Sequence, residues 1–109
     1  MIRRVKQRYL ALKIESVESF EEEDIKDAVW NAVIQLFGEY GASQAGLFLG
    51  QYDRHRKEAV LRCSHKALPM VQASIASVTL MKDKPAVIHV LRISGTLRAL
   101  KKKRRAHNC

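Results

Sequence analysis

Apolar and polar positions alternate near the start of the chain, in the segment RYLALKIES (residues 8–16). Leu10, Leu12 and Ile14 fall on one side of this segment, and Tyr9, Ala11 and Lys13 fall on the other. Successive side chains of a β-strand point to opposite faces, so the alternation predicts a strand with one buried face.

A helical period replaces the alternation in the next segment. Apolar residues recur three or four positions apart from Ile25 onward, and Ser19 stands three residues before Glu22, which is the spacing of a capping box. Glycine is typical of helix ends, and Gly38 and Gly41 follow the periodic residues. We therefore expect a long amphipathic helix that these two glycines terminate.

A hairpin is expected after this helix. The segments AGLFLGQY (45–52) and EAVLRCS (58–64) are short and apolar, and a polar, basic connection over residues 53–57 separates them. In the second segment, alternation places Ala59, Leu61 and Cys63 in the core and leaves Val60, Arg62 and Ser64 facing outward.

The last third of the chain predicts a second helix, a fourth strand and a short third helix. The second helix should run over residues 67–81, with Pro69 in its first turn, and KDKP should end it. The β-branched segment AVIHVLRI (86–93) indicates a strand. Ser94 or Thr96 can then cap a short helix that begins near Leu97.

The predicted order of elements is βαββαβ followed by a terminal helix. Right-handed crossovers fold this order into a four-stranded antiparallel sheet with both long helices on one face, and they make the first and fourth strands neighbours. We therefore predict an α+β, ferredoxin-like or RRM-like sandwich that forms a single domain over residues 1–109, with a basic carboxyl-terminal tail from about residue 97. Because this fold serves many functions, only the individual residues can indicate which function this chain performs.

Charge is distributed unevenly along the chain. The 109 residues carry a formal net charge of +9, and seven of the eleven acidic residues lie between positions 13 and 27. Without that segment, 18 basic and 4 acidic residues remain, a net charge of +14. Such an excess indicates a polyanionic partner, and we favour nucleic acid over an anionic membrane because the basic segments lack the Trp or Phe of an interfacial helix.

The hydrophobic segments and the cysteines indicate where in the cell the protein is expected. No apolar run approaches the roughly 18 residues of a membrane span, and Lys13 and Glu15 interrupt the only segment that could resemble a signal peptide. The two cysteines, Cys63 and Cys109, do not form a disulfide framework. These features predict a soluble protein of the cytoplasm without a membrane partner.

Basic residues gather at both ends of the chain. Ser94, Gly95 and Thr96 form a small turn, and the amides of a helix that starts there can hold a phosphate. The rival interpretation of the basic run that follows is a frayed, solubilising tail. Because the first and fourth strands should be neighbours, we expect the two basic clusters to form one surface for RNA phosphates; they comprise Arg3, Arg4, Lys6 and Arg8 at the amino end, and Arg98, Lys101, Lys102 and Arg105 at the carboxyl end.

Base stacking and catalysis have weaker support in the sequence. Tyr9 is the only aromatic residue that the patterns place outward on a central strand, so phosphate and 2′-hydroxyl contacts with a structured RNA fit better than stacking. The acids from Glu21 to Asp24 suit the first turn of a helix better than a metal site. Cys63 and His65 lack two further zinc ligands at a sensible spacing, and His55 and His89 lack an acid or nucleophile partner. We therefore assign no metal site or catalytic residue to this chain.

Four colinear blocks carry a family resemblance: RYLALKIES, LFGEYGAS, AVLRCSHKAL and ISGTLRALKKK. The chain resembles the family of ribonuclease P protein component 2, the archaeal counterpart of the eukaryotic Pop-five subunit. The short length, without an acidic carboxyl extension, is similar to the archaeal members. The resemblance implies a subunit of the ribonucleoprotein endonuclease that removes the 5′ leader of precursor tRNA, in which the RNA subunit and its Mg²⁺ perform hydrolysis.

The resemblance also implies partners and roles. Expected partners are ribonuclease P RNA, precursor tRNA, protein component 3, in a heterotetramer with this chain, and other ribonuclease P proteins. Expected RNA contacts are Arg8, Tyr9, Arg62, Ser94, Gly95, Thr96, Arg98 and the cations after it. Trp30, Ile34 and Phe37 are candidates for the protein partner, with core packing as the equally supported alternative. Two other classes stay open: a general structured-RNA-binding or ribosome-associated module, and a stand-alone metal nuclease.

Overall fold

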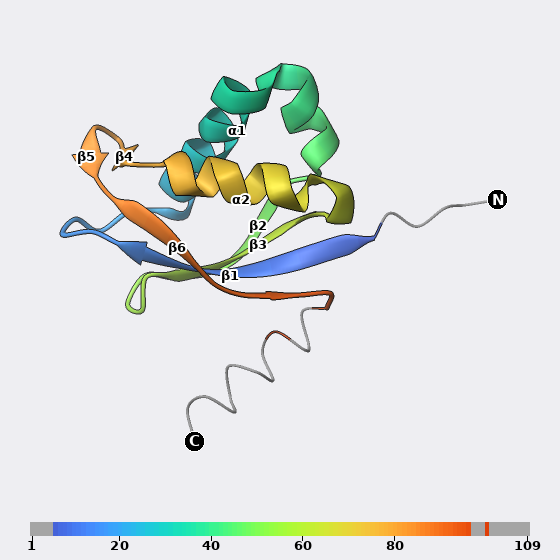
Figure 1. The fold of residues 1–109 in the computed structure, drawn as a ribbon. Helices are drawn as coiled ribbons and strands as arrows, with labels where there is room; N and C mark the ends of the chain where they lie inside the picture. Colours follow the sequence, from blue (N-terminus) through green and yellow to red (C-terminus); the bar gives the residue numbers. More distant parts are fainter. Residues whose placement is uncertain (1–5, 97–99, 101–109) are drawn as a thin grey trace.

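The computed structural model describes residues 6–96 and residue 100, and it contains one four-stranded sheet and two α-helices (Figure 1). The elements in chain order are β1 (Gln7–Glu15), α1 (Glu22–Ala45), β2 (Phe48–Asp53), β3 (Glu58–Ser64), a 3₁₀ turn (His65–Ala67), α2 (Leu68–Ser77), β4 (Leu80–Met81), β5 (Lys84–Pro85) and β6 (Val87–Ser94).

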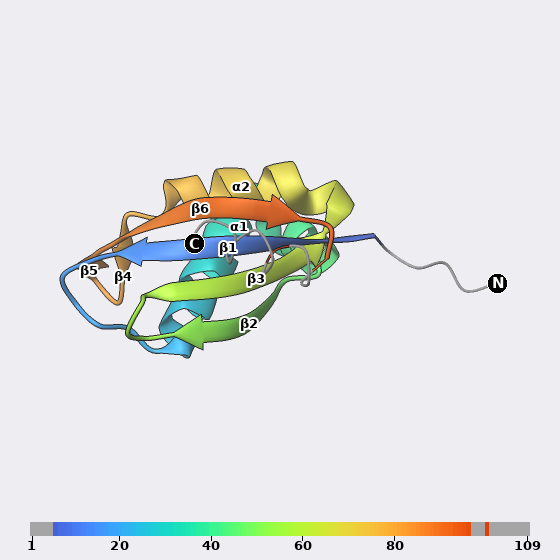
Figure 2. The same cartoon turned by 90° about the horizontal axis from the view of Figure 1, so that it is seen from below.

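The four long strands form a sheet in the order β2-β3-β1-β6, and all neighbouring pairs are antiparallel. β1 and β6 are neighbours, as the sequence predicts. Both helices cover one face of the sheet, and Figure 2 shows the strands from the opposite side, which we call the open face. The structure is therefore α+β and consistent with the predicted ferredoxin-like fold. The predicted carboxyl-terminal helix lies outside the described residues, apart from Leu100.

The core lies between the sheet and the helices. The predicted alternation in β1 is confirmed, because Leu10, Leu12 and Ile14 are all buried in this layer. Val29 of α1 and Ile75 of α2 pack in the same cluster. Burying an aliphatic side chain of this size contributes about 1.5–3 kcal/mol, so these rows of side chains fix which face of the sheet the helices cover.

The first helix begins two residues later than predicted. Its N-cap is Glu21 rather than Ser19, and the capping box pairs Glu21 with Asp24. The backbone N–H of Glu21 donates to Oδ2 of Asp24 at 2.9 Å. Buried Phe20 stands directly before the cap, so tertiary packing moves the helix start to the residues that follow it.

The prediction that Gly38 and Gly41 end this helix is wrong. Gly38 interrupts the helical geometry with φ 78° and ψ 172°, but the chain resumes the helix and continues to Ala45, where Gly46 closes it in the left-handed conformation. Ala42 and Ala45 are buried, so packing of this second half against the domain stabilises it beyond the kink.

The second helix is shorter than predicted. It ends at Ser77 rather than at Met81, and the next residues form the two-stranded hairpin of β4 and β5. Lys82 and Asp83 occupy its turn with positive φ, and buried Met81 anchors it to the core. Neither described helix is both long enough and apolar enough to cross a membrane.

Candidate nucleic-acid interface

The predicted RNA-contacting residues that the structure describes lie together at one end of the sheet, where β1 begins and β6 ends. Tyr9 is paired with Arg62 of β3 on one side and with Ser94 of β6 on the other. Nη1 of Arg8 lies 3.4 Å from the position that a Cβ on Gly95 would occupy. The predicted convergence of the two strand ends is thus confirmed for these residues; Arg3, Arg4, Arg98, Lys101, Lys102 and Arg105 lie outside the described residues.

The turn after β6 is shaped by Ser94. Its side chain is buried, and its Oγ accepts the backbone N–H of Thr96 at 3.3 Å. The N–H of Leu100 donates to the carbonyl of Thr96 at 3.2 Å, which is the spacing of a helical turn. Gly95 and Thr96 are exposed. Ser94 therefore holds the corner in shape, while its predicted contact with RNA stays a prediction.

Leu100 returns the chain to the open face of the sheet. It is only 2% exposed and lines a hollow together with Ala11, Val60 and Arg92. This burial makes Leu100 an anchor of the chain on the open face. Leu100 directly precedes the basic run of residues 101–105 in the sequence, so the described residue nearest to that run lies on the same face as Arg92.

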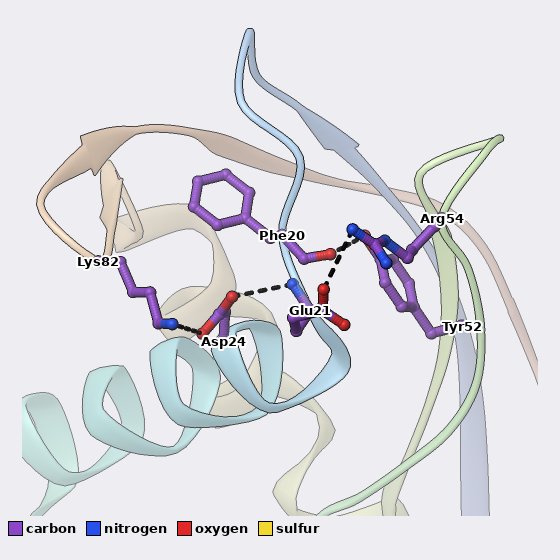
Figure 3. A network of polar contacts seen from close by, with 6 residues as sticks. All are labelled: Phe20, Glu21, Asp24, Tyr52, Arg54 and Lys82. Atoms are coloured by element: carbon purple, nitrogen blue, oxygen red, sulfur yellow. Dashed lines mark hydrogen bonds and ion pairs between the residues drawn. The ribbon is translucent and has the colours of Figure 1, made fainter.

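The acidic residues are paired elsewhere. Glu21 binds Arg54 at 3.1 Å, and buried Asp24 binds Lys82 at 3.0 Å (Figure 3). The Glu21 N–H and Lys82 lower the pKa of Asp24 below its ordinary value. Further pairs join Glu18 to Lys84, Asp53 to Arg56 and Glu15 to His89. The pairs of Glu18, Glu21 and Asp24 hold the start of α1 to both hairpins, whereas the pair of Asp53 and Arg56 lies within the β2–β3 hairpin and the pair of Glu15 and His89 joins β1 to β6.

Four cations on β1, β3 and β6 or directly before β1 are left out of this pairing. Among residues 6–96 and 100, no ion pair within 4.0 Å includes Lys6, Arg8, Arg62 or Arg92. The Nε donors of Arg62 and Arg92 are also enclosed without a hydrogen-bond partner within this part of the chain. Arg62 and Arg92 share the open face, whereas Arg8 is paired with buried Cys63 on the helix side of β1. Unneutralised cations in this part of the sheet create a positive potential, which attracts a polyanion.

Phe48 is a surface residue that the sequence analysis overlooked. It lies on the edge strand β2, is 54% exposed and is paired with Arg62 in the sheet. The Arg62 guanidinium stands over the Phe48 ring, 4.9 Å from its centroid. The alternation of AGLFLGQY already separates Phe48 from buried Leu49, so the same rule that placed Tyr9 outward could have found it.

The candidates for the protein partner lie on the outer side of α1. Trp30 and Phe37 are 40% and 44% exposed, and Ile34 is half-buried. Trp30 also lines a hollow with Leu47 and Leu49 at the β2 side of the helix. This exposure favours a surface role for Trp30 and Phe37 over the alternative of core packing.

The described residues offer no group of three His, Cys, Asp or Glu side chains placed to hold a metal ion. Burial raises the pKa of the Cys63 thiol to about 11, so Cys63 is a poor metal ligand or nucleophile near neutral pH. The prediction that His89 lacks an acid partner is wrong, because its Nε2 lies 2.6 Å from Oε2 of Glu15. Both side chains of that pair are exposed.

Comparison with known proteins identifies the family. A model described as the Rpp14/Pop5 family matches residues 8–105. The chain belongs to the Rpp14/Pop5 family. Nearly the whole chain is matched, including all four long strands and both helices, so the resemblance seen in the sequence is confirmed.

Curated archaeal members of the Rpp14/Pop5 family are similar to this chain over most of its length. Ribonuclease P protein component 2 of Pyrococcus furiosus is 35% identical over 92% of this chain and 83% of the relative. Its counterpart from Methanocaldococcus jannaschii is 35% identical over 90% of this chain and 72% of the relative. A chain in the cryo-EM structure of yeast ribonuclease MRP shares the fold, with a TM-score of 0.71, 14% identity, and coverage of 100% of this chain and 99% of that chain.

Proposed function

We propose that this protein is the component 2 subunit of an archaeal ribonuclease P and assists the RNA-catalysed removal of the 5′ leader from precursor tRNA. The observation that carries the proposal is the family match over residues 8–105, together with relatives that are named as ribonuclease P protein component 2. In this role the chain binds and stabilises the catalytic domain of the RNA, while hydrolysis belongs to the RNA and its Mg²⁺.

The charge arrangement supports RNA binding at the end of the sheet where β1 begins. Lys6, Arg8 and Arg62 are not ion-paired within the described part of the chain, and the Arg8 guanidinium lies beside the corner formed by Gly95. The run of Arg98, Lys101, Lys102 and Arg105 extends this surface in the proposal, on the short basic helix that the sequence predicts. Phosphates would remove the repulsion among its adjacent cations.

The exposed residues of α1 support a protein contact. Trp30 and Phe37 are large aromatic residues on a surface helix, and aromatic residues are enriched in the centres of protein interfaces. The proposal places protein component 3 on this face, so that RNA and protein partner occupy different sides of the domain. It also keeps the cytoplasm as the expected location.

Reconstitution tests the proposed function. The protein is added with component 3 to an archaeal ribonuclease P RNA, and removal of the 5′ leader is measured at low Mg²⁺. We expect faster cleavage than with RNA and component 3 alone, and a smaller gain when Arg98, Lys101 and Lys102 are replaced by alanine. An absent gain, with similar binding to unrelated structured RNAs, would favour a general RNA-binding module instead. Mg²⁺-dependent cleavage by the protein alone would indicate a nuclease.

A further inference from the structure

Three π-bearing side chains form a row across the open face of the sheet. Phe48 of β2 is paired with Arg62 of β3, and Arg62 is paired with Tyr9 of β1. The row therefore crosses three neighbouring strands at a single level. The residues beside these positions, Leu10, Leu49 and Leu61, are buried on the helix side, so the row faces away from the core.

A groove accompanies this row. It has a volume of about 310 Å³ and is lined by Tyr9, Phe48, Gly50, Gln51, Val60 and Arg62. Gly50 opens part of this groove, because a Cβ at that position would lie 3.5 Å from the Val60 carbonyl and 4.0 Å from the Phe48 ring. The groove thus carries the Phe48 ring on β2 and the Tyr9 ring on β1, with the Arg62 cation on β3 between them.

The chemistry of the groove selects among possible occupants. Arg62 is stacked on Phe48 and has no carboxylate partner within the described residues. An aliphatic protein segment would leave this cation without a counter-charge. An unpaired nucleotide supplies both complements, since its base has a π face and its phosphate is an anion.

We infer that the row formed by Phe48, Arg62 and Tyr9 is a stacking platform for an unpaired nucleobase of RNA. The inference rests on the proposed RNA-binding function and adds a base-contacting site to a surface that otherwise contacts phosphates. It also reverses the expectation from the sequence that base stacking plays little part. Leu100 lies beside the platform, because its hollow shares Gln51 and Val60 with the groove.

The test compares two forms of one oligoribonucleotide with the full-length protein. The first is a single-stranded octauridine, and the second carries abasic sites at its central positions, so that its phosphates are kept. Binding is measured by fluorescence anisotropy at a fixed salt concentration. We expect the wild-type protein to bind the intact strand about tenfold more tightly than the abasic strand.

Variants then locate the contact. Phe48→Leu and Tyr9→Leu should each weaken binding of the intact strand by about fivefold or more and leave the abasic strand unchanged. Phe48→Tyr should retain most of the binding. In Gly50→Val, the valine side chain should fill part of the groove without disturbing β2, because valine is favoured in β-strands. This variant should therefore also weaken binding of the intact strand only. Tyr40→Leu is the matched control, because Tyr40 is 79% exposed on α1.

Several outcomes overturn the platform. Equal binding of the intact and abasic strands shows a site for phosphates alone, and equal losses for both strands in Phe48→Leu show a change in fold. Preference for an acidic peptide over both strands assigns the groove to a protein. Circular dichroism of each variant establishes that it is folded. If Phe48→Leu binds octauridine normally and the wild-type protein still stimulates ribonuclease P RNA, the platform fails while the proposed function stands.

Discussion

The separation of paired from unpaired cations makes a quantitative prediction about salt. Lys6, Arg8, Arg62 and Arg92 lie outside the ion pairs of the described chain, whereas Arg54 and Lys84 are bound by acidic residues. Each cation that meets a phosphate of double-stranded RNA should steepen the decrease of log affinity with log salt by about 0.9, the value known for duplex DNA. Removing two cations from the unpaired group or two from the ion-paired group changes the net charge equally. The two changes should nevertheless have different effects on the salt dependence of RNA binding.

The perturbed protein carries Arg8→Gln and Arg62→Gln, which keep part of each side chain and remove two charges. If both residues contact phosphates, the slope should become less steep by about 1.8, so the variant loses roughly tenfold less affinity than wild type between 50 and 200 mM salt. The matched control carries Arg54→Gln and Lys84→Gln. Its slope should equal that of wild type, because both cations are neutralised by Glu21 and Glu18.

The assay is a filter-binding titration of an archaeal ribonuclease P RNA at five salt concentrations, with thermal unfolding of each variant as a test of folding. If RNA binds at the proposed interface, the slope of log affinity against log salt must differ between the two double variants. Equal slopes for both would show that RNA responds to net charge rather than to the cations at this end of the sheet, and would refute the placement of the interface.

Three predictions concern the fold. Gly38→Ala should lower the free energy of unfolding by about 1–3 kcal/mol in urea titrations, because φ 78° and ψ 172° suit only glycine; an unchanged midpoint would show that the kink is dispensable. Leu100→Ala should cost about 2 kcal/mol, whereas Leu80→Ala, at a site 55% exposed, should cost under about 0.5 kcal/mol; equal effects would contradict the burial of Leu100. The stability that Asp24 contributes through its lowered pKa is complete above pH 3.8 and is lost as pH falls through the pKa of the folded protein. Asp24→Asn should therefore make the free energy of unfolding depend less on pH in this acidic range. The same pH dependence in wild type and Asp24→Asn would disprove the prediction.

The local patterns of the sequence were sufficient for the four strands of the main sheet and for the presence of both long helices, but not for the short hairpin of β4 and β5. Alternation reports which side of a strand is buried, and the burial of Leu10, Leu12 and Ile14 follows it. Helix ends were predicted less well. Gly38 breaks helical geometry locally, yet burial of Ala42 and Ala45 carries the helix on, and no local signal reports that packing.

For the candidate site too, some features followed from the sequence and others only from the tertiary structure. Composition and motifs by themselves indicated a basic RNA-binding protein and its family, because charge and residue type are properties of the chain. Only the tertiary structure decided which cations are available, since Arg54 and Lys84 meet acids that are distant in sequence while Arg8 and Arg62 do not. It alone also placed Phe48 beside Arg62, because strand register sets that distance and register depends on the packing of the whole sheet.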